Sequence, residues 1–246
     1  MTTATKPKSG YEKWQDDIDG AAGDAKWHSY DCEIQMAVNE FNHHLSGQSG
    51  YRPLDWQLIK AMMWVESGAA KPEWKSRPIQ IGNHGDPGLR ALLSGKEGGD
   101  LILPPSWQGR LTTGSVGTIP SYNIRAGSGY LLMKMANFAI KSVPDADTKT
   151  YDITVKAGDS LDKIAGAQGS TVEMMKKLNP TAHVLRVGQV LKYQKATMKK
   201  VITGWKPVTT SSIATYYNGG GDSMYAKKLD YALSVIRKGA AAVCVQ

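Results

Sequence analysis

Hydrophobic residues recur at helical spacing along much of the first 145 residues, between short stretches that carry stop signals. Residues 31–47 place apolar side chains on one face and end at Gly47, which predicts a helix. A more hydrophobic stretch follows Asp55, a residue type that caps helix N-termini, and ends at Glu66. The chain therefore predicts a buried helix that terminates on a carboxylate.

Weaker patterns continue toward a change near residue 144. Asp86 as cap, Pro87 in the first turn and Gly95 as stop predict a short helix. Residues 98–123 are rich in Gly, Pro, Ser and Thr, and we expect loops or short strands there. Helical spacing then resumes over residues 124–143.

A small module with a different texture follows Pro144. Alternating residues from Tyr151 predict a strand, a turn and two short helices come next, and a final strand passes through Val190 and Leu191. Strand, helix, helix and strand within about 45 residues form a compact α+β module.

This module resembles the LysM family in "YDITVKAGDSLDKIA", "LNP" and "LRVGQVLKY". LysM modules bind polymers that contain N-acetylglucosamine, chiefly peptidoglycan and chitin, so the resemblance implies such a ligand. By position it also implies glycan contacts from two loops, at Gly158, Asp159, Ser160, Leu161, Asn179, Pro180 and Thr181. Helix capping and helix termination are the competing interpretation for several of these residues.

The chain continues past the module as helix, Gly-rich turn and helix over residues 211–239. Tyr225, Leu229 and Ile236 belong to an apolar stripe that a lone helical hairpin cannot bury. We therefore expect the tail to pack on the N-terminal helices, so that the module is an insertion.

The position of Glu66 indicates a candidate acid. A carboxyl in an apolar setting has a raised pKa because desolvation disfavours its charged form. Glycoside cleavage needs such an acid to protonate the leaving oxygen. An exposed acid beside a glycine stop is the structural alternative.

Two further segments resemble the lysozyme-like transglycosylase superfamily. "WVESG" at 64–68 is followed by "RPIQIGN" at 77–83, and "TYYNGGGDSMYAKKL" matches a later Tyr-Asn-Gly-Gly motif. The resemblance implies that Glu66 is the acid. It also implies that a set of residues orients the sugar or Glu66, or lets backbone approach the cleft: Gln80, Tyr217, Asn218, Gly219, Gly220 and Tyr225.

The chain departs from that superfamily in a shortened spacing between Glu66 and Gln80 and in the position of the LysM-like insert. The predicted fold is α+β, a mainly α-helical lysozyme-like domain interrupted by a βααβ LysM-like module. The predicted domains are a flexible leader at 1–10, the lysozyme-like domain at 11–145 and 197–246, and the module at 150–195.

The mechanism depends on a second carboxylate. An inverting hydrolase needs a base about 6.5–9.5 Å from the acid, whereas a lytic transglycosylase, by family resemblance, uses one glutamate as acid and then base. Asp86 has the best location, although its N-cap role explains it without catalysis. The other candidates are Glu73, Glu97 and Asp100.

Charge and cysteines add less. The net charge is +8, and the excess lies after residue 150, which favours an anionic partner such as a cell-wall polymer; no pattern indicates nucleic-acid binding. Cys32 and Cys244 make no disulfide framework, so two free thiols are the favoured interpretation. The alternative, a bridge between them, would require an oxidising compartment.

Metal and aromatic sites are weakly indicated. The five histidines form no ligand spacing, and we predict neither a metal nor a cofactor. Sugar stacking and core packing compete as interpretations of Trp56, Trp64, Trp74 and Trp107, with packing favoured for most of them.

The expected function is cleavage of the β-1,4 bond between N-acetylmuramic acid and N-acetylglucosamine in peptidoglycan. The alternatives are a lytic transglycosylase, a chitinase-like enzyme and a non-catalytic peptidoglycan-binding protein. No apolar segment for export or membrane insertion is present. We therefore expect action in the periplasm or cell wall after delivery by a phage lysis or toxin secretion system, with an immunity protein or secretion machinery as possible partners.

Overall fold

The chain folds into two compact units. The computed structural model describes residues 7–239 and residue 244. One unit contains the chain up to Asn137 together with the chain from Thr203 onward, and the other contains Phe138–Ile202. The second unit thus interrupts the first in sequence.

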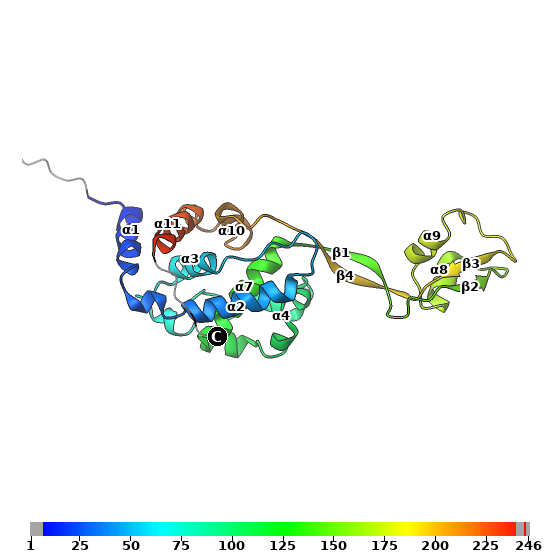
Figure 1. Ribbon diagram of the computed structural model, residues 1–246, viewed down its shortest axis with the longest axis horizontal. Helices are drawn as coiled ribbons and strands as arrows, with labels where there is room; N and C mark the ends of the chain where they lie inside the picture. Colours follow the sequence, from blue (N-terminus) through cyan, green and yellow to red (C-terminus); the bar gives the residue numbers. More distant parts are fainter. Residues whose placement is uncertain (1–6, 240–243, 245–246) are drawn as a thin grey trace, which may run out of the picture. The chain divides into compact units, whose positions relative to one another are not determined.

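The first unit is helical. Its α-helices are α1 (Gly10–Ala21), α2 (Asp31–Leu45), α3 (Trp56–Glu66), α4 (Pro87–Ser94), α5 (Gly99–Ile102), α6 (Thr113–Thr118), α7 (Pro120–Met135), α10 (Thr210–Tyr216) and α11 (Tyr225–Lys238). Short 3-10 turns are η1 (Ala25–His28), η2 (Pro72–Lys75) and η3 (Pro105–Trp107). Helix α3 packs between α11 and α2, and α2 also packs on α7 (Figure 1). The tail therefore covers the N-terminal helices, as its unpartnered apolar stripe predicted.

Local capping explains the helices that the sequence predicted. Asp55 accepts a hydrogen bond from the Gln57 backbone N–H (2.9 Å), and α3 runs from there to Glu66 as predicted. Helix α4 begins after the Asp86 cap and ends at Gly95, whose φ of 68° suits glycine. Both predicted helices are confirmed.

Three predictions in this unit need correction. The helix expected over 124–143 ends at Met135, because residues 136–144 leave it as strand β1 (Ala136–Pro144) and pair with β4 (Ala196–Trp205). Residues 98–119 form short helices and turns, and residues 120–123 already belong to α7, so the range contains no strand. Part of the leader expected at 1–10 is ordered, since Ser9 and Glu12 make a reciprocal capping box that starts α1; residues 1–6 lie outside the described residues.

The second unit contains the predicted strand, helix, helix and strand. These are β2 (Tyr151–Thr154), α8 (Leu161–Ala167), α9 (Val172–Leu178) and β3 (Val190–Tyr193). Strands β2 and β3 are antiparallel, with Tyr151 opposite Tyr193. The two helices and β3 supply a small core that includes Ile164, Met175 and Leu191.

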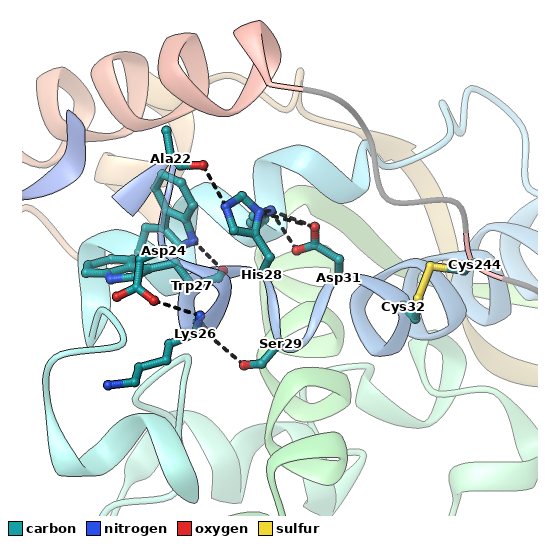
Figure 2. Close-up of polar contacts among 11 residues, drawn as sticks. Ala22, Asp24, Lys26, Trp27, His28, Ser29, Asp31, Cys32 and Cys244 are labelled. Carbon is teal, nitrogen blue, oxygen red and sulfur yellow. Dashed lines mark hydrogen bonds and ion pairs between the residues drawn. A yellow bond between two sulfur atoms is a disulfide. The ribbon is translucent and has the colours of Figure 1, made fainter. Parts of the chain in front are cut away.

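The cysteines are paired. Cys32 in α2 and Cys244 form a disulfide with Cα atoms 5.4 Å apart (Figure 2), so the favoured interpretation of two free thiols is wrong. Sequence separation of 212 residues left no local signal for the pairing. Among the described helices, none is both long and apolar enough to span a membrane.

Candidate active site around Glu66

Glu66 is the last residue of α3, and its carboxyl is held by a tyrosine from the other end of the chain. The Tyr225 hydroxyl donates to Glu66 Oε1 at 2.6 Å. Tyr225 is the first residue of α11 and is 2% exposed. The packing of α11 on α3 therefore brings together two residues that the sequence named separately.

Burial dominates the electrostatics of Glu66. It raises the pKa of the carboxyl above its ordinary value, and the nearby Asp222 carboxylate raises it further. The Tyr225 hydrogen bond and the charges of Lys71 and Lys228 oppose this shift without cancelling it. The arrangement favours a protonated Glu66 at a higher pH than for a carboxyl in water.

The segment around Gln80 is fastened to the end of α3. The Ser67 hydroxyl donates to the Pro78 carbonyl at 2.7 Å. Gln80 has a φ of 58°, the one positive value among the described non-glycine residues. Such a backbone costs on the order of 1–3 kcal/mol and persists where the surroundings enforce it, often at functional sites.

Residues of helix α7 hold the backbone of Gln80 in this conformation. Asn123, which is fully buried, accepts from the Ile79 N–H at 3.0 Å and donates to the Ile81 carbonyl at 2.7 Å, one residue on each side of Gln80. Gly127 has no side chain, and the Ile79 side chain packs against it. A Cβ at position 127 would lie only 2.4 Å from Ile79 Cγ2. Asn123 was not among the predicted site residues, because a lone asparagine inside a helix belongs to no motif.

Tyr217 joins the same cluster. Its hydroxyl donates to the Ile79 carbonyl at 3.3 Å, and its ring lies 5.4 Å from that of Tyr130. Burial raises the pKa of Tyr217 well above its ordinary value, and the charges of Glu66 and Asp86 add to the shift. The two predicted carboxylates therefore both lie near Tyr217.

The glycine-rich turn after Tyr217 is fixed by Asn218. Asn218 Oδ1 accepts from the Asp222 N–H at 3.0 Å, and Gly219 and Gly220 have φ values of 67° and 75°. Asp222 in turn pairs with Lys228 at 2.6 Å. These contacts give Asn218 a role in shaping the turn. Asp222 is a further carboxylate near Glu66 and was not among the predicted candidates.

Asp86 is engaged by backbone groups. Its Oδ1 accepts from the N–H groups of Gly88 (2.7 Å) and Leu89 (3.1 Å), and its Oδ2 accepts from Gly82 (2.7 Å). Asp86 thus caps α4 and ties down the loop after Gln80. Its catalytic role stays a prediction.

The residues predicted to contact glycan in the second unit lie on its turns. Gly158 is exposed with a φ of 80°, Ser160 caps α8, and Asp159 accepts from the Lys156 N–H at 2.7 Å. Asn179 exchanges hydrogen bonds with the Lys192 backbone at 2.7 and 2.8 Å. The remaining three candidates are half-buried Leu161 and exposed Pro180 and Thr181.

Most of the candidate stacking tryptophans are core residues. Trp64, Trp74 and Trp107 are 2%, 6% and 8% exposed, as the packing interpretation predicted. Trp64 also donates to the Trp27 carbonyl at 3.1 Å.

Comparison with known proteins identifies the second unit. Searches of curated proteins and of solved structures found no match to the chain. The family model for the LysM domain matches residues 153–193, within the predicted bounds of 150–195. Residues 153–193 are therefore a LysM domain, which suggests that the protein binds peptidoglycan.

Proposed function

We propose that the helical unit cleaves the glycan strands of peptidoglycan at the β-1,4 bond between N-acetylmuramic acid and N-acetylglucosamine. The observation that carries the proposal is the half-buried Glu66 carboxyl at the end of α3, hydrogen-bonded to Tyr225. The LysM domain supplies affinity for the polymer.

Glu66 is the proposed general acid. Its raised pKa keeps a proton available for the glycosidic oxygen as the bond to C1 of the muramic acid breaks. General acid–base catalysis of this kind contributes about 10²–10⁴-fold to a rate. Gln80 is the predicted sugar-orienting residue nearest to Glu66 in the sequence. It follows Ile79, whose carbonyl accepts a hydrogen bond from Tyr217.

The contacts of Asp86 favour a mechanism with a single carboxylate. Both of its oxygens accept backbone hydrogen bonds, so it is poorly placed to activate water. In this single-carboxylate mechanism, Glu66 first gives up its proton as the acid. It then acts as the base and takes the proton of the muramic acid C6 hydroxyl. That oxygen then bonds to C1, which yields a 1,6-anhydro end without consuming water.

Mass spectrometry of the fragments released from purified peptidoglycan tests the proposal. A 1,6-anhydro end is lighter by one water than a reducing end, so it supports the single-carboxylate mechanism, whereas reducing N-acetylmuramic acid supports the muramidase. Glu66→Gln should abolish release, and Asp230→Asn, which changes an exposed carboxylate on α11, should not. If the wild-type protein binds walls but releases nothing, the chain is a peptidoglycan-binding protein.

The disulfide supports action outside a reducing cytoplasm. Disulfides persist in oxidising compartments such as the periplasm, and the Cys32–Cys244 bridge lies in the same unit as Glu66. This agrees with a substrate in the cell wall.

A further inference from the structure

A surface cavity of about 560 Å³ borders the Glu66 site, and the proposed cleavage chemistry does not use it. Its wall includes Val65 and Ser67, the two neighbours of Glu66, and Lys228, one turn beyond Tyr225 on α11. Helix α1 and Trp27 of η1 supply much of the remaining wall. Its volume lies within the roughly 300–1,000 Å³ typical of ligand sites.

The wall that α1 contributes is fixed in place. The Tyr231 hydroxyl of α11 bonds both carboxylate oxygens of Asp19 at 2.9 Å. Trp14 stacks on Tyr11 at 5.7 Å and also meets the Tyr231 ring at 6.1 Å. Helix α1 is thus docked on α11 by aromatic contacts and hydrogen bonds.

The Trp27 wall is equally constrained. Gly68 has a φ of 66°, and a Cβ there would lie 2.6 Å from the Trp27 ring. The Trp27 carbonyl accepts from Trp64 Nε1 at 3.1 Å, and the two rings pack edge to face. The cavity is therefore preformed beside the end of α3.

Charges of both signs line this cavity. Asp17 on α1 and Lys71 after α3 both line it. Across residues 7–239 and 244, neither takes part in an ion pair. A neutral sugar would leave Asp17 and Lys71 without an ion pair, whereas a ligand with an ammonium and a carboxylate would pair with both.

We propose that this cavity binds the peptide stem that peptidoglycan carries on its N-acetylmuramic acid residues. Stem peptides hold several carboxylates and a free amine, which match Lys71 and Asp17 in sign. The cavity begins at the residues that flank Glu66, so a stem on the sugar being cleaved lies within reach. The inference rests on the proposed function and makes peptide-bearing strands its preferred substrate.

The test compares two soluble substrates: glycan strands with stem peptides, and the same strands after an amidase has removed the peptides. The intact protein should cleave the peptide-bearing strands with a kcat/KM roughly 25-fold higher, given two new exposed ion pairs worth about fivefold each. Asp17→Asn should lower that kcat/KM roughly fivefold, the effect of one exposed ion pair of about 1 kcal/mol. It should leave the peptide-free rate unchanged.

Asp230→Asn is the matched control, because Asp230 is exposed on α11 and does not line the cavity. Equal wild-type rates on the two substrates, or an equal loss on both for Asp17→Asn, would overturn the inference. Cleavage of neither substrate would refute the proposed function instead. Tryptophan fluorescence with the free stem tetrapeptide then decides: saturable binding weakened by Asp17→Asn and by Lys71→Gln supports the peptide site, and no binding overturns it.

Discussion

Removing the Cys32–Cys244 disulfide should sharply destabilise the helical unit. The bridge joins residues 212 positions apart. In the chain-entropy model, closing a loop of that length restricts the unfolded chain enough to add about 5 kcal/mol to the free energy of unfolding. The LysM domain lies inside the loop, and if Phe138–Ile202 stays folded while the helical unit unfolds, the shorter effective loop lowers this by only about 0.3 kcal/mol.

Thermal unfolding followed by circular dichroism measures the effect. At about 2–4 °C per kcal/mol for a chain of this size, Cys32→Ser should lower the Tm by roughly 10–20 °C. A reducing agent should lower the Tm of the wild-type protein by the same amount and leave Cys32→Ser unchanged. The oxidised wild-type protein should show no titratable thiols, which verifies that the bond is formed. If its reduction then shifts the Tm by only a degree or two, the reasoning is refuted, since the bond restricts nothing in the unfolded chain.

Three further predictions concern Glu66 and its supports. Tyr225→Phe removes a hydrogen bond that lowers the pKa of Glu66, so the alkaline limb of the pH–rate profile should move to higher pH; a shift to lower pH would contradict this. Because burial raises the folded-state pKa of Glu66, its stabilising contribution is complete below its unfolded pKa and is lost as pH rises through the folded one. Glu66→Gln should therefore be more stable than the wild type in urea at neutral pH, with no such advantage below about pH 4; a pH-independent difference would count against a raised pKa. Gly127→Ala places a Cβ against Ile79 and should cost about 1–3 kcal/mol and slow cleavage, while Gly10→Ala, which meets nothing within 4 Å, should do neither.

The sequence predicted those parts of the fold whose causes are local. Asp55 and Asp86 act on backbone groups two or three residues away, so the starts of α3 and α4 could be seen in a short window. Strand β1 could not, because helical spacing continues past Met135 and only pairing with β4, some 60 residues later, makes residues 136–144 extended. The disulfide is the extreme case of the same difficulty.

Buried polar contacts were likewise invisible in the sequence. Lys60, 3% exposed, donates to Asp31 at 2.7 Å and contacts His28 Nδ1 at 2.8 Å. His28 Nε2 in turn lies 3.1 Å from the Ala22 carbonyl (Figure 2). The cluster links the end of α1 to α2 and α3. The helical pattern around Lys60 predicted an apolar helix, and burial of a lysine there is tolerated because its ammonium is paired and hydrogen-bonded.

The position of the LysM domain within the chain follows from how the insertion is closed. The Lys206 N–H donates to the Met135 carbonyl at 2.8 Å, and Lys206 Nζ donates to the Lys134 carbonyl at 3.0 Å. Thr203 Oγ1 also donates to the Asn137 carbonyl at 3.2 Å. The chain therefore leaves the end of α7 and returns beside it, so that the insertion does not change where α10 and α11 begin. Tyr217 and Tyr225 are therefore positioned by contacts within the helical unit, with Ile79, Tyr130 and Glu66, which is why two site motifs can lie on either side of a whole domain in the sequence.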